Sequence, residues 1–472
     1  MEDNLLKKFL TFSYGSGIGL IIGFFTTMVT TRILDPEDFG KASMFTLAIN
    51  VCTIFIIFGH DQSFVRFFYE EKEEKRGGLL YNCLKIPIII AVIISLLILF
   101  FSKQISLFLF EEKNLKIIFI LIFGMIIQIL YRYGVLVIRM QKKGNLFSLL
   151  EILNRLSQFA IIIILFFFIG PSYEIIIYST VITLSVLAVV SIMFAKKFWH
   201  YRNISLENLK HSKAGILNYS YPLVLTTLIT WLFESFDKVA IRNWSDFQEL
   251  GLYAAAFKIV ALLSVIQVAF STFWSPICYE KFEADPEDRT FYEHISTIVA
   301  FSMFIVAIVT IAFKDIIIML LGQEYGEAGK IIPFLVFMPI MYTLSETTVI
   351  GINFYKKPKW HILIAGIVCV VNIVGNSILV PPYGATGAAI STALSYIIFF
   401  GLRTYVSLKY YKVNYKLKKV YFVIFTILLY GFYSLHNETL LGSILVGFIF
   451  FSIVIIVYFR DLLNLYRNYK NI

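Results

Sequence analysis

The stretch TTRILDPEDFGKAS, residues 30–43, places a polar turn between two apolar runs. The runs on either side, predicted at residues 9–32 and 40–60, each have about 20 mostly apolar residues, the length that an α-helix needs to cross a bilayer. Within the stretch, Pro36 and Gly40 are typical of a turn, and the charged side chains around them require water. This part of the sequence therefore predicts two membrane-spanning helices joined by a short connector.

The rest of the chain has the same apolar character. Of its 472 residues, 58% are hydrophobic and 15% are charged, and the mean hydropathy is +0.79. A soluble protein of this length needs far more polar surface, so the composition predicts an all-α integral membrane protein. The predicted spans number fourteen and lie at residues 9–32, 40–60, 79–101, 115–138, 145–169, 173–195, 214–241, 250–272, 291–314, 329–351, 360–380, 384–407, 419–435 and 440–459.

The positive charges are distributed unevenly between alternate connectors. With the N-terminus placed inside, the inner connectors and tails hold 28 of the 41 lysines and arginines, Arg403 included, and the outer connectors hold nine. Cytoplasmic connectors carry an excess of Lys and Arg, so this bias predicts a cell-membrane protein with both termini in the cytoplasm. It also accounts for the net charge of +10 without a nucleic-acid partner.

Sequence signals of catalysis and of bound cofactors are missing. The four cysteines, Cys52, Cys83, Cys278 and Cys369, have no CxxC spacing and predict neither a disulfide framework nor a zinc site. The histidines are scattered, and no GxSxG, HExxH or Walker motif occurs. We therefore expect a protein that is not an enzyme and that uses no cofactor apart from a coupling Na⁺ or H⁺.

The chain also repeats itself at a nearly constant offset of 207 to 214 residues. The corresponding segments are LTFSY (10–14) with LNYSY (217–221), FGKASMF (39–45) with LGLYAAAF (250–257), IRMQKKGN (138–145) with INFYKKPK (352–359), and YST (178–180) with IST (390–392). The offset covers six predicted helices, so both copies enter the membrane in the same direction, and such parallel repeats place a substrate site between two lobes. The predicted divisions are an N-terminal six-helix lobe at 1–200, a C-terminal six-helix lobe at 201–412, and two additional helices with a cytoplasmic tail at 413–472.

Three segments carry a family resemblance: TTRILDPEDFGKASMFTLAIN (30–50), FDKVAIRNWSDFQELGLYAAAFKI (236–259) and PPYGATGAAISTALSYI (381–397). Together with the helix count, they resemble the polysaccharide flippases of the multidrug/oligosaccharidyl-lipid/polysaccharide exporter superfamily. The resemblance implies two lobes around a central cavity. It also implies translocation of undecaprenyl-diphosphate-linked sugars to the outer leaflet by alternating access. The partners it implies are the lipid-linked oligosaccharide, membrane lipids and polysaccharide assembly proteins.

Ionisable residues within the predicted spans are candidates for a binding site, because a charge inside a bilayer is costly. Cations suit a diphosphate, arginine through its forked guanidinium and lysine as a point charge. Two alternatives remain open: Lys85 and Arg132 can extend to the inner headgroups, and Arg155 can pair with Glu151. The predicted substrate-binding residues are Arg32, Lys85, Arg132, Arg155 and Lys258.

Acidic residues in the seventh predicted span indicate a second site. Glu234 and Asp237 lie in this span, and Asn372 and Asn376 lie one helical turn apart in the eleventh. Carboxylate and amide oxygens suit a hard cation. The resembling lipid II flippases build a sodium site from the same two spans, with an additional acid where this chain has asparagines. We therefore predict that these four residues couple transport to Na⁺ or H⁺; the alternative is an ion cluster of Asp237 with the basic residues that follow it.

Two other functions remain open. A cation-coupled multidrug exporter of the same superfamily is favoured if deep acids outnumber deep bases, but four of each occur, Glu151 and Glu346 among the acids. A membrane glycosyltransferase or polymerase is less consistent with the sequence, because it needs a sizeable loop with catalytic acids and every predicted connector is short.

Overall fold

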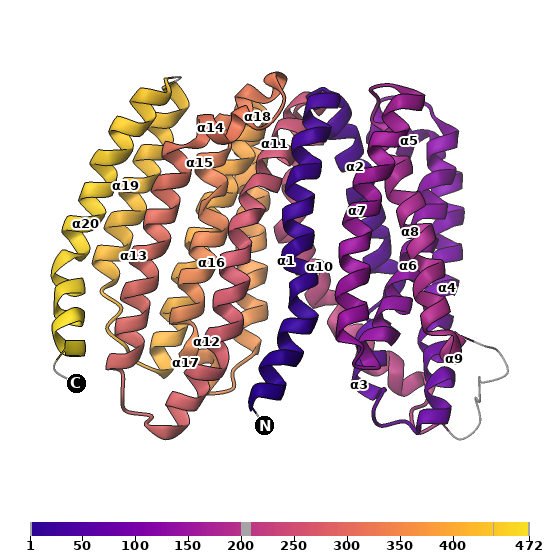
Figure 1. The fold of residues 1–472 in the computed structure, drawn as a ribbon, viewed down its shortest axis with the longest axis horizontal. Coiled ribbons are helices and arrows are strands. Elements are labelled where there is room, and N and C mark those ends of the chain that lie inside the picture. Colours follow the sequence, from indigo (N-terminus) through magenta and orange to yellow (C-terminus); the bar gives the residue numbers. More distant parts are fainter. Residues whose placement is uncertain (1, 200–208, 438, 471–472) are drawn as a thin grey trace. The chain divides into compact units, whose positions relative to one another are not determined.

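The computed structural model describes residues 2–199, 209–437 and 439–470, and in these ranges the secondary structure is helical, with no β-strand. Twelve helices of the described ranges are long and apolar enough to cross a membrane, or thirteen if the bent pair Gln323–Lys330 and Ile332–Thr348 is one span. The long helices of each unit described below run side by side (Figure 1). The prediction of an all-α membrane protein is confirmed, whereas the predicted number of fourteen spans is not.

The chain divides into two units, residues 1–34 with 38–231 and residues 35–37 with 232–472. The change from one unit to the other falls inside a single helix, α10 (Lys213–Trp244). The predicted lobe boundary at residues 200–201 lies outside the described residues. The three-part division of the chain and the parallel repeat stay predictions.

In the first unit, α1 packs against α7, and α6 packs against α8. Gly15 permits the first of these contacts, because a Cβ at this position would lie 2.5 Å from the Cα of Ser148. The helices of this unit that precede α10 are α1 (Glu2–Ile33), α2 (Pro36–Ile57), α3 (His60–Phe67), α4 (Arg76–Phe100), α5 (Ser102–Phe110), α6 (Leu115–Met140), α7 (Gly144–Ile169), α8 (Glu174–Phe194) and α9 (Lys196–Trp199).

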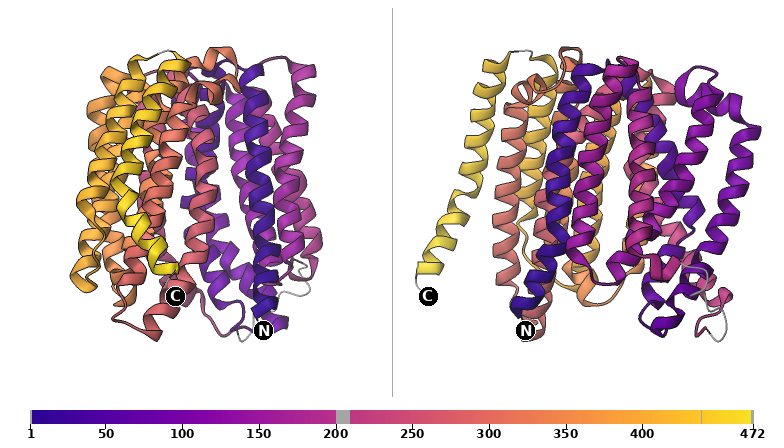
Figure 2. Two further views of the ribbon diagram at one scale, coloured as in Figure 1. Left: turned by 60° about the vertical axis from the view of Figure 1, so that its left-hand side comes forward. Right: turned by 45° about the vertical axis from the view of Figure 1, so that its right-hand side comes forward.

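The second unit continues from α10 to the C-terminus. Its helices are α11 (Phe247–Val260), α12 (Ser264–Ala284), α13 (Thr290–Ala312), α14 (Lys314–Met319), α15 (Ile332–Leu335), α16 (Phe337–Thr348), α17 (Ile350–Phe354), α18 (Lys359–Tyr410), α19 (Leu417–His436) and α20 (Leu440–Lys470). The last two helices, yellow in Figure 2, pack against α13. Lys416 and Lys419 hold them together by binding Asp461 at 3.3 and 2.7 Å.

The 52-residue element α18 consists of two antiparallel arms. Its backbone leaves the helical conformation at Gly384, where φ is 52° and ψ is −134°. Ser391 Oγ donates a hydrogen bond to the carbonyl of Asn372 at 3.1 Å, whereas in a straight helix these residues would be about 28 Å apart. The turn therefore folds the predicted spans 360–380 and 384–407 against each other. Because both lie in α18, they count as one helix among the twelve.

The polar connector between α1 and α2, within residues 30–43, is packed as well as exposed. Its residues Asp35–Glu37 belong to the second unit. Tyr325 donates a hydrogen bond from its hydroxyl to the carbonyl of Asp35 at 3.0 Å. Pro36 lies against Gly251 of α11, where a Cβ would come within 1.8 Å of the proline carbonyl oxygen. Glycine at position 251 therefore makes this close contact possible.

Candidate functional site

In the first unit, Arg132 of α6 is held by Asp61 of α3. The backbone is left-handed at Phe58 and Gly59 (φ 47° and 69°), which separates α2 from α3 and lets α3 begin at His60. Arg132 donates hydrogen bonds from Nε at 3.0 Å and from Nη2 at 2.5 Å to Oδ2 of Asp61. The arginine side chain is 49% exposed and the aspartate 6%. The buried carboxylate therefore fixes the guanidinium while leaving it accessible to a ligand.

Arg155 of α7 is exposed and makes no hydrogen bond or ion pair with another described residue. Glu151, four residues earlier, instead accepts a hydrogen bond from Ser16 Oγ of α1 at 2.7 Å. The close approach of α1 and α7 at Gly15 brings this serine to Glu151. The alternative in which Arg155 pairs with Glu151 is therefore not realised, and Arg155 has no direct counterion among the described residues.

The three other cations of the predicted substrate-binding set are also exposed. Arg32 lies in the last turn of α1 and Lys85 in α4, both in the first unit, and Lys258 lies near the end of α11 in the second unit. The four cations of the first unit come from four different helices, α1, α4, α6 and α7. Within the described residues, no shared hydrogen-bonding partner links these four.

In the second unit, Asp237 of α10 is buried at the centre of a hydrogen-bonded cluster. Its Oδ2 accepts hydrogen bonds from the hydroxyl of Tyr253 in α11 at 2.5 Å and from Thr392 Oγ1 in α18 at 2.7 Å. Its Oδ1 accepts from the side-chain amides of Asn376 and Asn372 at 2.8 and 3.2 Å. These bonds join three helices and occupy both carboxylate oxygens. The structure thus brings together Asp237, Asn372 and Asn376 from the predicted ion-coupling set.

Glu234, the fourth member of that set, lies outside the cluster. Its side chain is exposed and makes no hydrogen bond or ion pair with another described residue. Lys238 does not pair with Asp237 either, since its Nζ lies over the ring of Phe257, 5.4 Å from the centroid. Lys238 therefore forms no ion pair with Asp237, although the two charges interact. The guanidinium of Arg242 lies over the ring of Phe247, 4.4 Å from the centroid.

Tyr253 and Thr392 complete the cluster, although neither was predicted as a site residue. Both stand in the recurring segments LGLYAAAF and IST and in segments that carry the family resemblance, and these are the sequence signals that point to them. The hydroxyl of Thr392 reaches Asp237 because the turn at Gly384 folds the second arm of α18 back along the first. A 20-residue separation from Asn372 gives no indication of that proximity.

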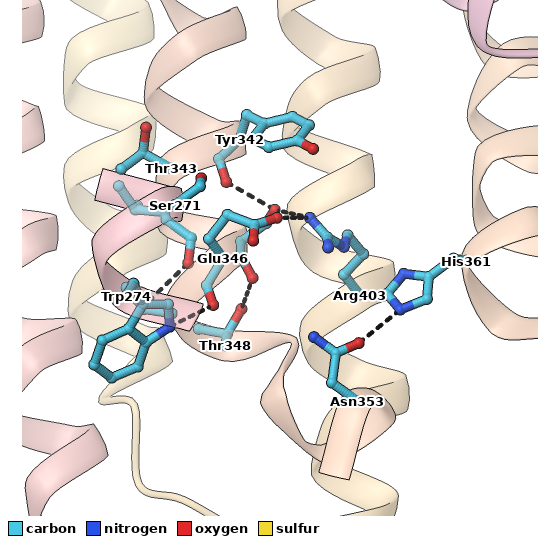
Figure 3. Close-up of polar contacts among 12 residues, drawn as sticks. Ser271, Trp274, Tyr342, Thr343, Glu346, Thr348, Asn353, His361 and Arg403 are labelled. Carbon is cyan, nitrogen blue, oxygen red and sulfur yellow. Dashed lines mark hydrogen bonds and ion pairs between the residues drawn. The ribbon is translucent and has the colours of Figure 1, made fainter. Parts of the chain in front are cut away.

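A second buried charge pair joins α16 and α18 in the same unit (Figure 3). Arg403 Nη1 donates to Glu346 Oε1 at 2.9 Å and to Ser345 Oγ at 2.5 Å, and the two charged side chains are 8% and 15% exposed. Trp274 of α12 donates from Nε1 to the carbonyl of Glu346 at 3.0 Å. The prediction that Arg403 lies in a cytoplasmic connector is wrong, because the residue lies well inside the second arm of α18 and is buried by its neighbours.

These groups are suited to binding. Among the described residues, no three His, Cys, Asp or Glu side chains are placed to hold a metal ion. In the first unit, exposed guanidinium groups can bind an anion through paired hydrogen bonds. In the second unit, a buried carboxylate with oxygen-bearing neighbours can interact with a small hard cation.

Apolar helices that carry such charged groups are typical of a multi-pass membrane protein with a functional site inside its spans. The model of the family described as "Polysaccharide biosynthesis protein" matches residues 5–280, which is more than half of the chain. The protein therefore belongs to this polysaccharide biosynthesis family. A search of curated proteins gives no match.

Solved structures of other membrane proteins share the fold. The "Lipid II flippase MurJ, inward closed conformation" superposes with a TM-score of 0.72 at 17% identity, over 96% of this chain and 99% of that one. An inward-facing multidrug resistance MATE family transporter of the MOP superfamily gives 0.64 at 15% identity, over 84% and 94%. An outward-facing one gives 0.53 at 14% identity, over 85% and 95%. The family model confirms the polysaccharide branch of the resemblance inferred from the three sequence segments, and these structures show the fold that goes with it.

Proposed function

We propose that this protein is a flippase that moves undecaprenyl-diphosphate-linked oligosaccharide units from the inner to the outer leaflet of the cytoplasmic membrane, for synthesis of a cell-surface polysaccharide. The family membership and the fold shared with a lipid II flippase support this proposal. We further propose that it works by alternating access, with both termini in the cytoplasm. Polysaccharide assembly proteins are the proposed partners.

The observation that carries the proposal is the accessibility of two arginines within the helices of the first unit. Arg132 is anchored by buried Asp61 yet 49% exposed, and Arg155 has no counterion among the described residues. A diphosphate that leaves water for the membrane interior needs such groups, since its charge must be compensated by cations and hydrogen bonds. Arg32, Lys85 and Lys258 are proposed as further cations along the path of the headgroup.

We also propose that Asp237 couples transport to Na⁺ or H⁺, with Asn372 and Asn376 as neighbouring ligands. A carboxylate buried in a membrane span is costly unless it is hydrogen-bonded, protonated or paired with a cation. In the cluster the amide nitrogens donate to Asp237. If each side-chain amide rotates by about 180°, it presents its oxygen to the carboxylate side instead of its nitrogen. An amide oxygen is the type of ligand that a hard cation requires. Glu234 lies outside this set of direct ligands.

The experiment that tests the flippase function is deletion of the gene, followed by measurement of undecaprenyl-linked repeat units on each leaflet. We expect these units to accumulate on the inner leaflet and the wild-type gene to restore their export. Arg155→Ala is expected to restore export poorly, whereas Lys412→Ala, which changes an exposed lysine outside the helices, should restore it fully. Normal distribution of the lipid between leaflets in the deletion strain would contradict the proposal.

A cation-coupled multidrug exporter is the second candidate, because the buried Asp237 cluster and the fold shared with a MATE transporter favour it. Such an exporter removes lipophilic cations, for which exposed Arg132 and Arg155 are unfavourable neighbours. Efflux of ethidium from cells that express the protein separates the two candidates. Efflux that depends on Asp237 and is unaffected by Arg155→Ala would favour the exporter.

A further inference from the structure

The buried pair of Glu346 and Arg403 leaves hydrogen-bonding capacity unused. Arg403 is 6% exposed, and its Nη1 is occupied by Glu346 and Ser345, but its Nε has no partner among the described residues. The buried hydroxyl oxygen of Ser271 in α12 has none there either. Buried polar groups of native proteins are satisfied by protein, water or ligand. The free Nε of Arg403 can therefore donate a hydrogen bond to an oxygen atom of a bound molecule.

Two aromatic rings lie close to the guanidinium of Arg403. Its Cζ lies 4.9 Å from the ring centroid of Phe399 and 5.7 Å from that of Tyr342, and these two rings stack at 5.8 Å from each other. Both aromatic side chains are half-buried, so neither is sealed into the core. Figure 3 shows Tyr342 beside the charge pair. The charged groups therefore lie next to apolar ring surface that a ligand can contact.

Glu234 adds an exposed carboxylate near the same rings. The preceding residue, Phe233, has its ring centroid 6.1 Å from that of Phe399 and 4.7 Å from that of Tyr396. The charge of Glu234 also acts on Tyr342 and Tyr396. The site then holds two carboxylates and one cation. The net charge of about −1 disfavours a bare phosphate. A simple cation would leave the free Nε–H donor of Arg403 without an acceptor.

A sugar matches this combination of groups better than either ion. Each sugar hydroxyl can donate one hydrogen bond to a carboxylate and accept others from a guanidinium. The apolar C–H face of the sugar ring can pack on an aromatic ring. Ligand sites of this kind combine aromatic walls with a few placed polar groups, as observed here.

We propose that Glu234, Tyr342, Glu346, Phe399 and Arg403 form a sugar-binding site that holds the glycan of the lipid-linked substrate. This inference rests on the proposed flippase function and adds to it the residues that recognise the sugar. The site lies wholly in the second unit. The diphosphate is assigned to other residues, the exposed cations.

The variants that test this site must leave the fold intact. Truncating Arg403 or Glu346 alone would leave its partner buried without a counter-charge, so neither is the first choice. Glu234→Gln is suitable because the side chain is exposed and free of hydrogen bonds to other described residues. Phe399→Leu removes a ring and keeps an apolar side chain. Tyr405→Leu is the matched control, since Tyr405 is 62% exposed and, two residues beyond Arg403, points away from it on the helix.

The measurement is the affinity of the full-length protein in nanodiscs for two probes. One probe is the lipid-linked oligosaccharide extracted from cells that lack the protein, and the other is undecaprenyl diphosphate prepared from it by removing the sugars. We expect the wild type to bind the glycosylated lipid about tenfold more tightly or better. In Glu234→Gln and Phe399→Leu this preference should fall by about five- to tenfold, the equivalent of one or two hydrogen bonds or one ring contact, while the affinity for undecaprenyl diphosphate stays unchanged. Tyr405→Leu should behave as the wild type.

The possible failures are distinguishable. If the wild type binds neither lipid, the flippase function itself is wrong. If it binds both equally, or if both variants keep the full preference for the glycosylated lipid, the sugar site is overturned while the flippase function stands. Loss of affinity for both probes in the variants would also overturn the site, because a sugar contact cannot affect a lipid that has no sugar.

Discussion

An arginine–carboxylate pair lies within the helices of each unit, and the two pairs differ in which group is exposed. In the pair of Asp61 and Arg132, the carboxylate is 6% exposed and the arginine 49%. In the pair of Glu346 and Arg403, the arginine is 8% exposed and the carboxylate 15%. The same two chemical groups therefore present a cation in the first unit and bury it in the second. Burial of the arginine decides whether it can meet an anionic ligand.

The predicted repeat sharpens this comparison. At the offset of 214 residues between IRMQKKGN and INFYKKPK, Arg132 of α6 corresponds to Glu346 of α16, so the two units carry opposite charges at this position. The partners come from different elements, Asp61 from α3 and Arg403 from α18. A charged pair inside a membrane protein is costly to keep, and each is therefore a candidate for function.

The largest effect should come from breaking the buried pair. Arg403→Ala leaves Glu346 buried without a counter-charge, which is expected to lower the free energy of unfolding by about 3–5 kcal/mol. Arg132→Ala should cost less, about 1–3 kcal/mol, because water enters the half-exposed place that the arginine leaves. Unfolding in micelles with a rising fraction of SDS measures both. The double variant Arg403→Leu with Glu346→Leu should recover most of the loss, and equal costs for the two alanine variants would contradict the comparison.

The second effect is expected at Asp237, the buried carboxylate whose hydrogen-bond donors are neutral side chains. Asp237→Asn removes the charge that accepts four hydrogen bonds and should lower the stability by about 1.5–3 kcal/mol. It should also abolish any sodium dependence of transport. Glu283→Gln is the control, because Glu283 is an exposed carboxylate of α12 that lies outside the cluster. An unchanged sodium response in Asp237→Asn would leave the cluster with a structural role only.

A smaller effect is expected when Arg155 keeps its charge but loses the forked shape of its guanidinium. Arg155→Lys keeps the positive charge but loses the fork that binds a phosphate through two hydrogen bonds. We expect it to retain part of the flipping activity, about threefold below the wild type, which corresponds to the loss of one hydrogen bond. Initial rates in reconstituted vesicles measure this. A rate as low as that of Arg155→Ala would show that the fork, and not the charge, is required.

The smallest effect is expected at a pair that faces solvent. Arg66 and Glu70 are 55% and 27% exposed, and His211 also bonds Glu70 at 3.0 Å. Burial acts to raise the pKa of Glu70, but Arg66 and the hydrogen bond with His211 outweigh it, so the pKa lies below the ordinary 4.5. Because the pKa is lowered in the folded state, Glu70 contributes to the stability of the fold above about pH 4.5. This contribution is lost as the pH falls through the folded-state pKa of Glu70.

Glu70→Gln should therefore lower the melting temperature slightly at neutral pH, and this loss should shrink at an acidic pH below the folded-state pKa of Glu70, where the wild-type carboxyl is protonated too. Thermal unfolding at the two pH values measures the difference. A loss at neutral pH as large as that of Arg403→Ala would contradict the ranking of pairs by burial.

The parts of the site that the sequence predicted are those with a local signal. Asn372 and Asn376 are polar residues one turn apart in an apolar run, and such residues need a buried partner. Asp237 is an acid in another apolar run, and the structure joins the three. The exposed cations were identified in the same way, as isolated charges in apolar segments. Each of these inferences needed only the residue and its immediate neighbours.

The parts that the sequence did not predict depend on the tertiary fold. Asp61 follows the left-handed residues after α2, and its contact with Arg132 crosses 71 positions of the chain. Thr392 reaches Asp237 only because α18 turns at Gly384, and the same turn makes two predicted spans count as one helix. Arg403 lies seven residues before the end of α18, close enough to the end of the helix to be counted with the connector that follows. Its burial comes from packing against α16, which no local pattern indicates.

The central claim is that exposed arginines of the first unit hold the diphosphate while it crosses the membrane. A diphosphate carries about two negative charges, so a cytoplasm-negative potential of about 100 mV can supply roughly 4–5 kcal/mol toward outward movement if the protein cations stay in place. Helix-borne Arg132 and Arg155 can stay in place in this sense, and Lys258 of the second unit can do the same.

The most direct test is the rate of flipping in reconstituted vesicles, with the potential set by valinomycin and potassium. We predict that the wild type slows when the potential is collapsed. Arg132→Ala, Arg155→Ala and Lys258→Ala should each flip at least about tenfold more slowly than Lys412→Ala at equal protein levels, the equivalent of one charge-assisted hydrogen bond. Full flipping by the alanine variants at the wild-type rate would contradict the claim.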